Sequence, residues 1–161
     1  MTTDPALLPA LFHGWHDYQS LLIHALEPLT ADQLALRHAP GLRSIGMIAT
    51  HMIGARARWF YLGFEEGGAD FKALGNWDRR GRRARSAAEL VSGLERTWDG
   101  MQAAIASWTP EQWAETFPGE EGEPEIITRQ WVIWHLLEHD LHHGGEISLT
   151  LGAHGLKGLN L

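Results

Sequence analysis

Apolar residues recur at intervals of three and four along most of the chain, which is the spacing of one face of an α-helix. The densest example spans residues 126–152, where apolar side chains form two adjacent stripes. The first stripe holds Ile127, Trp131, Trp134, Leu137 and Leu141, and the second holds Val132, Leu136, Ile147 and Leu151. A helix that is apolar on two sides is typical of the interior of a bundle. The pattern therefore predicts a long buried helix over this stretch.

Three further stretches have the same periodicity, over residues 5–27, 45–64 and 87–108, and each follows a residue that starts helices. Thr3, Asp4 and Pro5 precede the first, while Ser44 and the Ser86–Glu89 capping box precede the others. Residues 69–85 and 116–125 carry no such periodicity and are predicted to be loops. No stretch shows the alternation of apolar and polar residues that would predict a β-strand. The chain is therefore predicted to be an all-α four-helix bundle, a single domain over residues 1–161, with connections long enough to allow parallel neighbours.

Composition excludes several classes of protein. No apolar run approaches the roughly 20 residues of a membrane span, and the N-terminal region lacks the basic segment of a signal peptide, so we expect no membrane partner and a cytoplasmic location. The net charge of −7 argues against general nucleic-acid binding. The chain contains no cysteine. Disulfides are thereby excluded, and any metal must be held by nitrogen and oxygen ligands.

Histidines supply a candidate metal site. The stretch 126–152 contains His135, His139, His142 and His143. Residues four apart are neighbours on a helix, so His139 and His143 can direct two imidazoles at one ion. His51 lies on the inward stripe of the helix predicted over residues 45–64 and is the third candidate. Three imidazoles with open positions are typical of catalytic zinc sites, and nickel, iron or manganese would also fit. The alternative is that three core histidines only pack and hydrogen-bond.

Residues around these histidines have candidate supporting roles. His135 lies one turn before His139 and is the substitute ligand. Glu138 and Asp140 are candidates to accept the second N–H of a ligand histidine. Glu146 is the candidate catalytic acid or base beside the metal.

Two tracts resemble the DinB-like (DinB/YfiT) superfamily of metal-binding four-helix bundles. They are Ser44 to Met52, which contains His51, and His139 to Ile147, which reads His-Asp-Leu-His-His-Gly-Gly-Glu-Ile. The resemblance implies a left-handed bundle of up-down-down-up order, frequent homodimers, and a zinc or nickel ion on His51, His139 and His143. Here Gly144 replaces the usual arginine and Glu146 the usual glutamine. Better-known relatives are transferases or isomerases that use mycothiol, bacillithiol or glutathione.

These observations leave three functions open. The first is a metal-dependent transferase that acts with a low-molecular-weight thiol on a small-molecule substrate. The second is a non-catalytic stress-response or binding protein with a structural metal, and the third is a dimeric bundle whose histidines merely pack. The five arginines between Arg79 and Arg85 are interpreted either as an anion-binding loop or as a solvated basic loop.

Overall fold

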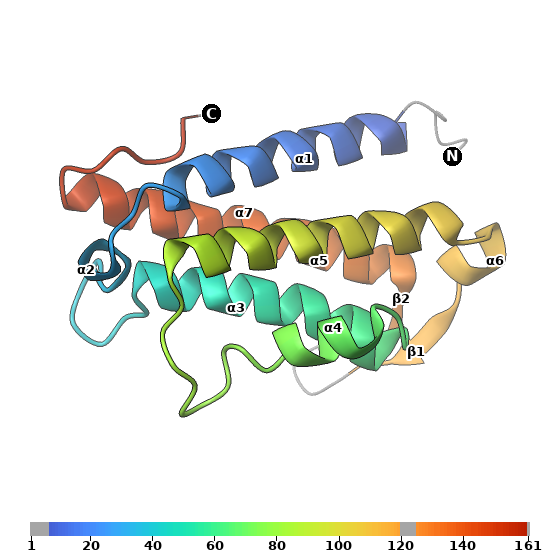
Figure 1. Ribbon diagram of the computed structural model, residues 1–161. Helices are drawn as coiled ribbons and strands as arrows, with labels where there is room; N and C mark the ends of the chain where they lie inside the picture. Colours follow the sequence, from blue (N-terminus) through green and yellow to red (C-terminus); the bar gives the residue numbers. More distant parts are fainter. Residues whose placement is uncertain (1–6, 120–124, 161) are drawn as a thin grey trace.

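Four long helices form the protein in the computed structural model, which describes residues 7–119 and 125–160 (Figure 1). They are α1 (Leu7–Leu26), α3 (Ile45–Arg58), α5 (Ala87–Ser107) and α7 (Arg129–Ala153). In Figure 1, α3 and α5 run in one direction and α1 and α7 in the opposite one, which is an up-down-down-up order. The predicted all-α bundle is thus confirmed, whereas the helix start predicted at Thr3 to Pro5 lies outside the described residues. Among those described, no helix has both the length and the apolar character that crossing a membrane requires.

Shorter elements occupy the connections between the long helices. They are α2 (Ala31–Leu34), the π-helix η1 (Trp59–Gly63), α4 (Gly68–Leu74), α6 (Pro110–Trp113), β1 (Thr116–Pro118) and β2 (Ile126–Thr128). The helix predicted over residues 45–64 therefore continues past Arg58, but with the wider hydrogen-bond spacing of a π-helix. Such turns are frequent at functional sites.

Side-chain caps fix where the long helices begin. The Ser44 hydroxyl accepts a hydrogen bond from the Met47 amide at the start of α3, and Ser86 forms the predicted capping box with Glu89 at the start of α5. Thr128 caps α7 through the Trp131 amide. The long helix predicted from residue 126 consequently starts three residues later.

A short hairpin replaces the plain loop predicted over residues 116–125. Strands β1 and β2 are antiparallel, and Phe117 lies opposite Ile127. The run of β-branched residues in β2 favours extended structure. The Phe117 ring also lies 5.5 Å from that of Phe64, so the hairpin is held against the end of the helical core. The prediction that the chain contains no strand is wrong for this pair.

Helix α7 is buried along one side rather than two. Val132, Leu136 and Ile147 are fully buried, as the second predicted stripe requires. Trp134 and Leu141 of the first stripe are 59% and 47% exposed, so this part of the prediction is wrong. The reason is that α7 packs against α1 and α3 and leaves its remaining side open to solvent.

A buried ion pair joins the four long helices. The Arg56 guanidinium donates from Nη2 to Asp140 Oδ2 at 2.6 Å, and both side chains are completely buried. Trp15 Nε1 donates to the same carboxylate oxygen at 2.7 Å, while Arg56 also donates to Gln19 Oε1 and the Leu94 carbonyl. Asp140 was a candidate partner for a ligand histidine, but its carboxylate is committed to this pair.

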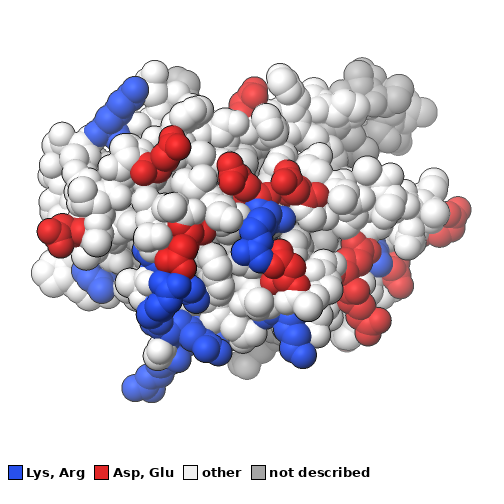
Figure 2. Space-filling model, viewed as in Figure 1, with Lys and Arg blue, Asp and Glu red and all other residues white. Residues whose placement is uncertain are grey.

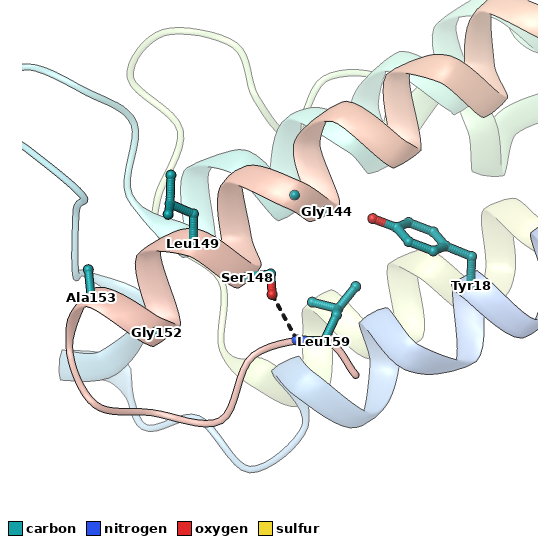
Figure 3. Close-up of a pocket in the computed structure, with 8 residues that line it drawn as sticks. Tyr18, Gly144, Ser148, Leu149, Gly152, Ala153 and Leu159 are labelled. Atoms are coloured by element: carbon teal, nitrogen blue, oxygen red, sulfur yellow. Dashed lines mark hydrogen bonds between the residues drawn. The ribbon is translucent and has the colours of Figure 1, made fainter. Parts of the chain in front are cut away.

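Small residues on α7 allow close contact with α1. Figure 3 shows Tyr18 of α1 pointing at Gly144, beside a hollow of about 520 Å³ that Ser148 and Leu159 also line. The Tyr18 hydroxyl donates to the Leu141 carbonyl at 3.3 Å. A Cβ on residue 144 would overlap that hydroxyl and lie 2.8 Å from Tyr18 Cζ. The close contact with Tyr18 therefore favours glycine at position 144.

The substitution Gly144→Ala should lower the free energy of unfolding by about 1–3 kcal/mol, because the added methyl overpacks a buried contact. Gly145→Ala is the matched control, since a Cβ there meets no atom within 4 Å. It should be neutral or stabilise the helix by up to about 1 kcal/mol. Urea unfolding of both variants measures the difference. Equal stabilities would contradict the proposed packing requirement.

Candidate metal centre

Three imidazoles converge between α3 and α7. His51 comes from α3, and His139 and His143 lie one turn apart on α7. The Nε2 atoms of His51 and His139 are 3.2 Å apart. Each of the three residues offers a ring nitrogen, and these nitrogens all lie within 4.8 Å of one another. The structure thus brings together the three histidines that the sequence pattern singles out.

Carboxylates hold the outer nitrogens of two of these rings. His51 Nδ1 lies 2.9 Å from Asp78 Oδ2, and His143 Nδ1 lies 2.6 Å from Glu146 Oε2. An ionised carboxylate can only accept, so each Nδ1 carries the proton and each Nε2 keeps its lone pair. This is the arrangement that orients histidines toward a metal. The donor set therefore fits a divalent ion.

His139 differs from the other two rings in its outer nitrogen. Its Nδ1 atom is buried and has no hydrogen-bond partner among the described residues. Its Nε2 atom lies 3.2 Å from His51 Nε2, so this is the nitrogen that faces the other rings. Among the described residues, no carboxylate therefore orients the His139 ring.

Asp78 is the functional residue that the sequence pattern does not reveal. It lies in the loop after α4, where Arg58 donates to both of its oxygens at 2.5 and 3.0 Å. Burial alone would raise the pKa of Asp78, but the hydrogen bonds from His51 and Arg58, together with their charge, hold that pKa well below its ordinary range. The carboxylate is therefore ionised when His51 needs an acceptor.

The imidazoles of His139 and His143 are neutral at neutral pH. Burial, together with the nearby charge of His143 and His51, lowers the pKa of His139 to about 2. Burial also lowers the pKa of His143, and the hydrogen bond that His143 donates to Glu146 opposes this shift. Neutral imidazole is the form that binds metals, so both rings are available without first losing a proton.

The metal-free protein should lose stability between pH 6.5 and pH 5. A folded-state pKa below the unfolded value of 6.5 means that the unfolded chain binds more protons, so acid favours unfolding. The slope is about 1.4 kcal/mol per pH unit for each extra proton. Urea unfolding after chelation measures this loss. His139→Gln should reduce the slope, and an unchanged slope in that variant would contradict the assignment.

The structure also places the other candidate residues near the centre. The His135 ring stacks on Trp131, with centroids 5.0 Å apart, and lies 6.0 Å from His139. Glu138 is exposed. His142 is exposed and lies 3.7 Å from Glu146, so it forms with His143 and Glu146 a second, more open group of possible ligands.

Two cavities meet at His51. The first, of about 580 Å³, is walled by Trp59, Phe64 and Phe117 and also reaches His135 and His139; we call it the aromatic cavity. The second, of about 610 Å³, lies toward the start of α3 and is lined by arginines; we call it the arginine cavity. A small molecule can therefore approach His51 from two chemically different sides, and His139 from the aromatic cavity, whereas His143 lines neither cavity.

Comparison with known proteins agrees with this architecture. A family model described as the DinB superfamily matches residues 15–147, a range that contains all three histidines. The crystal structure of a DinB-like protein from Bacillus cereus is similar over 92% of this chain and 93% of that chain, with a TM-score of 0.71 and 19% sequence identity. At this identity the likeness shows the fold alone. No curated protein matches the sequence.

Proposed function

Because the chain belongs to the DinB superfamily, we propose that it is a divalent-metal-dependent enzyme, a transferase that acts with a low-molecular-weight thiol on a small-molecule substrate. The observation that carries the proposal is the convergence of His51, His139 and His143 in one cluster, of which His51 lines both cavities and His139 lines the aromatic cavity. A bound zinc or nickel ion would supply a Lewis acid that favours the thiolate form of a coordinated thiol.

The protein's own residues have three tasks in this proposal. The three imidazoles hold the ion on one side and leave the cavity side open. Asp78 and Glu146 keep the proton on each Nδ1, so that the rings cannot turn away from the ion. The aromatic walls of the cavity, Trp59, Phe64 and Phe117, offer an apolar acceptor a surface to pack against.

Glu146 is proposed to be a positioning residue. Its side chain is 45% exposed and its carboxylate accepts from His143, which supports orientation of that ring more directly than proton transfer to a substrate. Its role as a catalytic acid or base remains the alternative proposal.

The substitution Glu146→Gln should weaken zinc affinity by about 10- to 100-fold, which is the usual cost of losing an outer partner of a ligand histidine. Competition with a chromophoric chelator measures this affinity. Glu138→Gln, on the exposed side of α7, is the matched control and should leave the affinity unchanged. Normal zinc affinity with lost turnover in Glu146→Gln would instead favour the acid or base role.

Thiol-transfer assays test the reaction class. Metal-loaded protein should conjugate glutathione, bacillithiol or mycothiol to an apolar aryl chloride, and chelation should abolish turnover. Activity that survives chelation, or silence with all three thiols, would contradict the transferase.

A non-catalytic protein with a structural metal is the second candidate. It is favoured by the position of the centre between α3 and α7, where an ion would tie two long helices together. Thermal melting with and without a chelator distinguishes the two. Collapse of the bundle on chelation, combined with silent thiol assays, would favour the structural role.

We also propose that the protein forms a homodimer through the open side of α7. Trp134, Leu141 and Leu149 are 59%, 47% and 59% exposed, and their spacing places them on neighbouring positions of one helix face. Sedimentation equilibrium should report twice the chain mass, and Leu141→Glu should produce a monomer. A monomeric wild-type protein would contradict the dimer.

A further inference from the structure

Arginines from two separate loops surround the arginine cavity, which reaches His51. The segment before α3 contributes Arg37 and Arg43, and the loop between α4 and α5 contributes Arg79, Arg80 and Arg82. All five are exposed. In Figure 2, blue side chains gather where Figure 1 places the loop between α4 and α5.

Few acidic side chains lie near enough to neutralise the positive charge of this cavity. Asp78 is the acidic residue in its lining, and its carboxylate is already bound by Arg58 and His51. Glu89 pairs with Arg83 and Arg85, which also line the cavity. Within residues 7–119 and 125–160, the five arginines named above take part in no ion pair. The guanidinium groups of Arg43, Arg79, Arg80 and Arg82 are therefore available to an anion from outside the chain. The guanidinium group of Arg37 also donates to the Leu42 carbonyl and to Met47 Sδ.

The start of α3 adds to the same field. Ser44 and Gly46, at the N-terminus of this 14-residue helix, line the cavity. The aligned peptide dipoles place partial positive charge at that end of a helix. Two loops and one helix terminus thus direct positive charge into a single hollow, whose volume suits a small molecule.

The cavity is connected to the candidate metal centre through shared walls. His51 and Arg79 line both the arginine cavity and the aromatic cavity. A molecule that fills the arginine cavity would therefore also lie beside the His51 ring. The aromatic cavity reaches His51 and His139 from its own side.

We propose that the arginine cavity binds the carboxylate groups of the small co-substrate whose reacting atom lies at the three histidines. This inference rests on the proposed function. The planar guanidinium group donates two parallel hydrogen bonds to a carboxylate, so a lining with several arginines suits a molecule with more than one carboxylate. The aromatic cavity would then hold an uncharged acceptor.

The test uses a probe that cannot bind metal through sulfur. S-methylglutathione keeps both carboxylates of glutathione but has an alkylated sulfur, and malate is a smaller dicarboxylate. Calorimetry with zinc-loaded protein should show binding of at least one of them. Arg80→Gln/Arg82→Gln should raise its Kd about tenfold or more, because charge-assisted hydrogen bonds are lost. The control Arg96→Gln/Lys157→Gln removes two charges outside the cavity and should change Kd less than about twofold.

Every outcome decides the proposal. It is overturned if neither carboxylate binds, if the two double variants bind alike, or if inorganic phosphate binds tenfold more tightly than both probes, which would make this a phosphate site. His143→Ala separates it from the proposed function, because this candidate ligand lines neither cavity and carboxylate binding should persist there after the metal centre is disrupted. Loss of carboxylate binding in a folded His143→Ala protein would contradict a separate anion subsite. If the carboxylates bind but no thiol gives turnover, the anion subsite is supported and the proposed transferase activity is contradicted.

Discussion

Replacing Asp140 with alanine should lower the free energy of unfolding by about 3–5 kcal/mol, the usual cost of leaving a buried charge without its partner. The Arg56 guanidinium would remain completely buried, with only neutral acceptors on Gln19 and Leu94. Trp15 would also lose the acceptor of its indole N–H. Because the pair joins the four long helices, the loss affects the whole bundle and not one contact.

Urea unfolding of the metal-free protein measures this effect without a contribution from metal binding. Asp99→Ala is the matched control, because Asp99 is an exposed aspartate on α5, and it should change stability by no more than about 0.5 kcal/mol. The double variant Arg56→Met/Asp140→Leu should recover most of the loss, since an apolar pair leaves no charge buried. A loss below about 1 kcal/mol in Asp140→Ala would contradict the assigned role.

Replacing His51 with alanine should weaken zinc binding by more than about 100-fold, which exceeds the cost of losing an outer partner. His51 is the ligand candidate on α3, so its removal leaves only the two imidazoles of α7. Competition with a chromophoric chelator measures the affinity, and far-ultraviolet circular dichroism verifies that the variant is folded.

His142→Ala is the matched control for that experiment. His142 belongs to the second group of possible ligands, with His143 and Glu146, and lies on the exposed part of α7. Zinc affinity should be unchanged in this variant. The opposite pattern, with zinc lost in His142→Ala and kept in His51→Ala, would move the metal to the second group.

The three histidines could be predicted because local rules decide their positions. Spacing of four places His139 and His143 on one side of α7, and the apolar neighbours of His51 place it on the inward side of α3. Capping residues are equally local, and the Ser44 and Ser86 caps are confirmed. The role of His51, His139 and His143 as metal ligands stays a prediction.

The partners of these histidines could not be predicted, because they depend on tertiary structure. Asp78 comes from a connection without periodicity, and its position beside His51 is set by Arg58 across the loop. Asp140 is adjacent to His139 in sequence, but the helix turns its side chain toward Arg56, which is 84 residues away. Proximity in sequence predicts a ligand histidine as the partner of Asp140, whereas in the structure its partner is Arg56.

X-ray absorption spectroscopy of untagged, zinc-loaded protein tests the central claim most directly. With one zinc ion per chain, the spectrum should require three imidazole ligands with Zn–N distances of about 2.0–2.1 Å. A spectrum that requires one or two imidazoles together with a carboxylate, or a protein that retains no stoichiometric zinc, would show that His51, His139 and His143 do not share one ion.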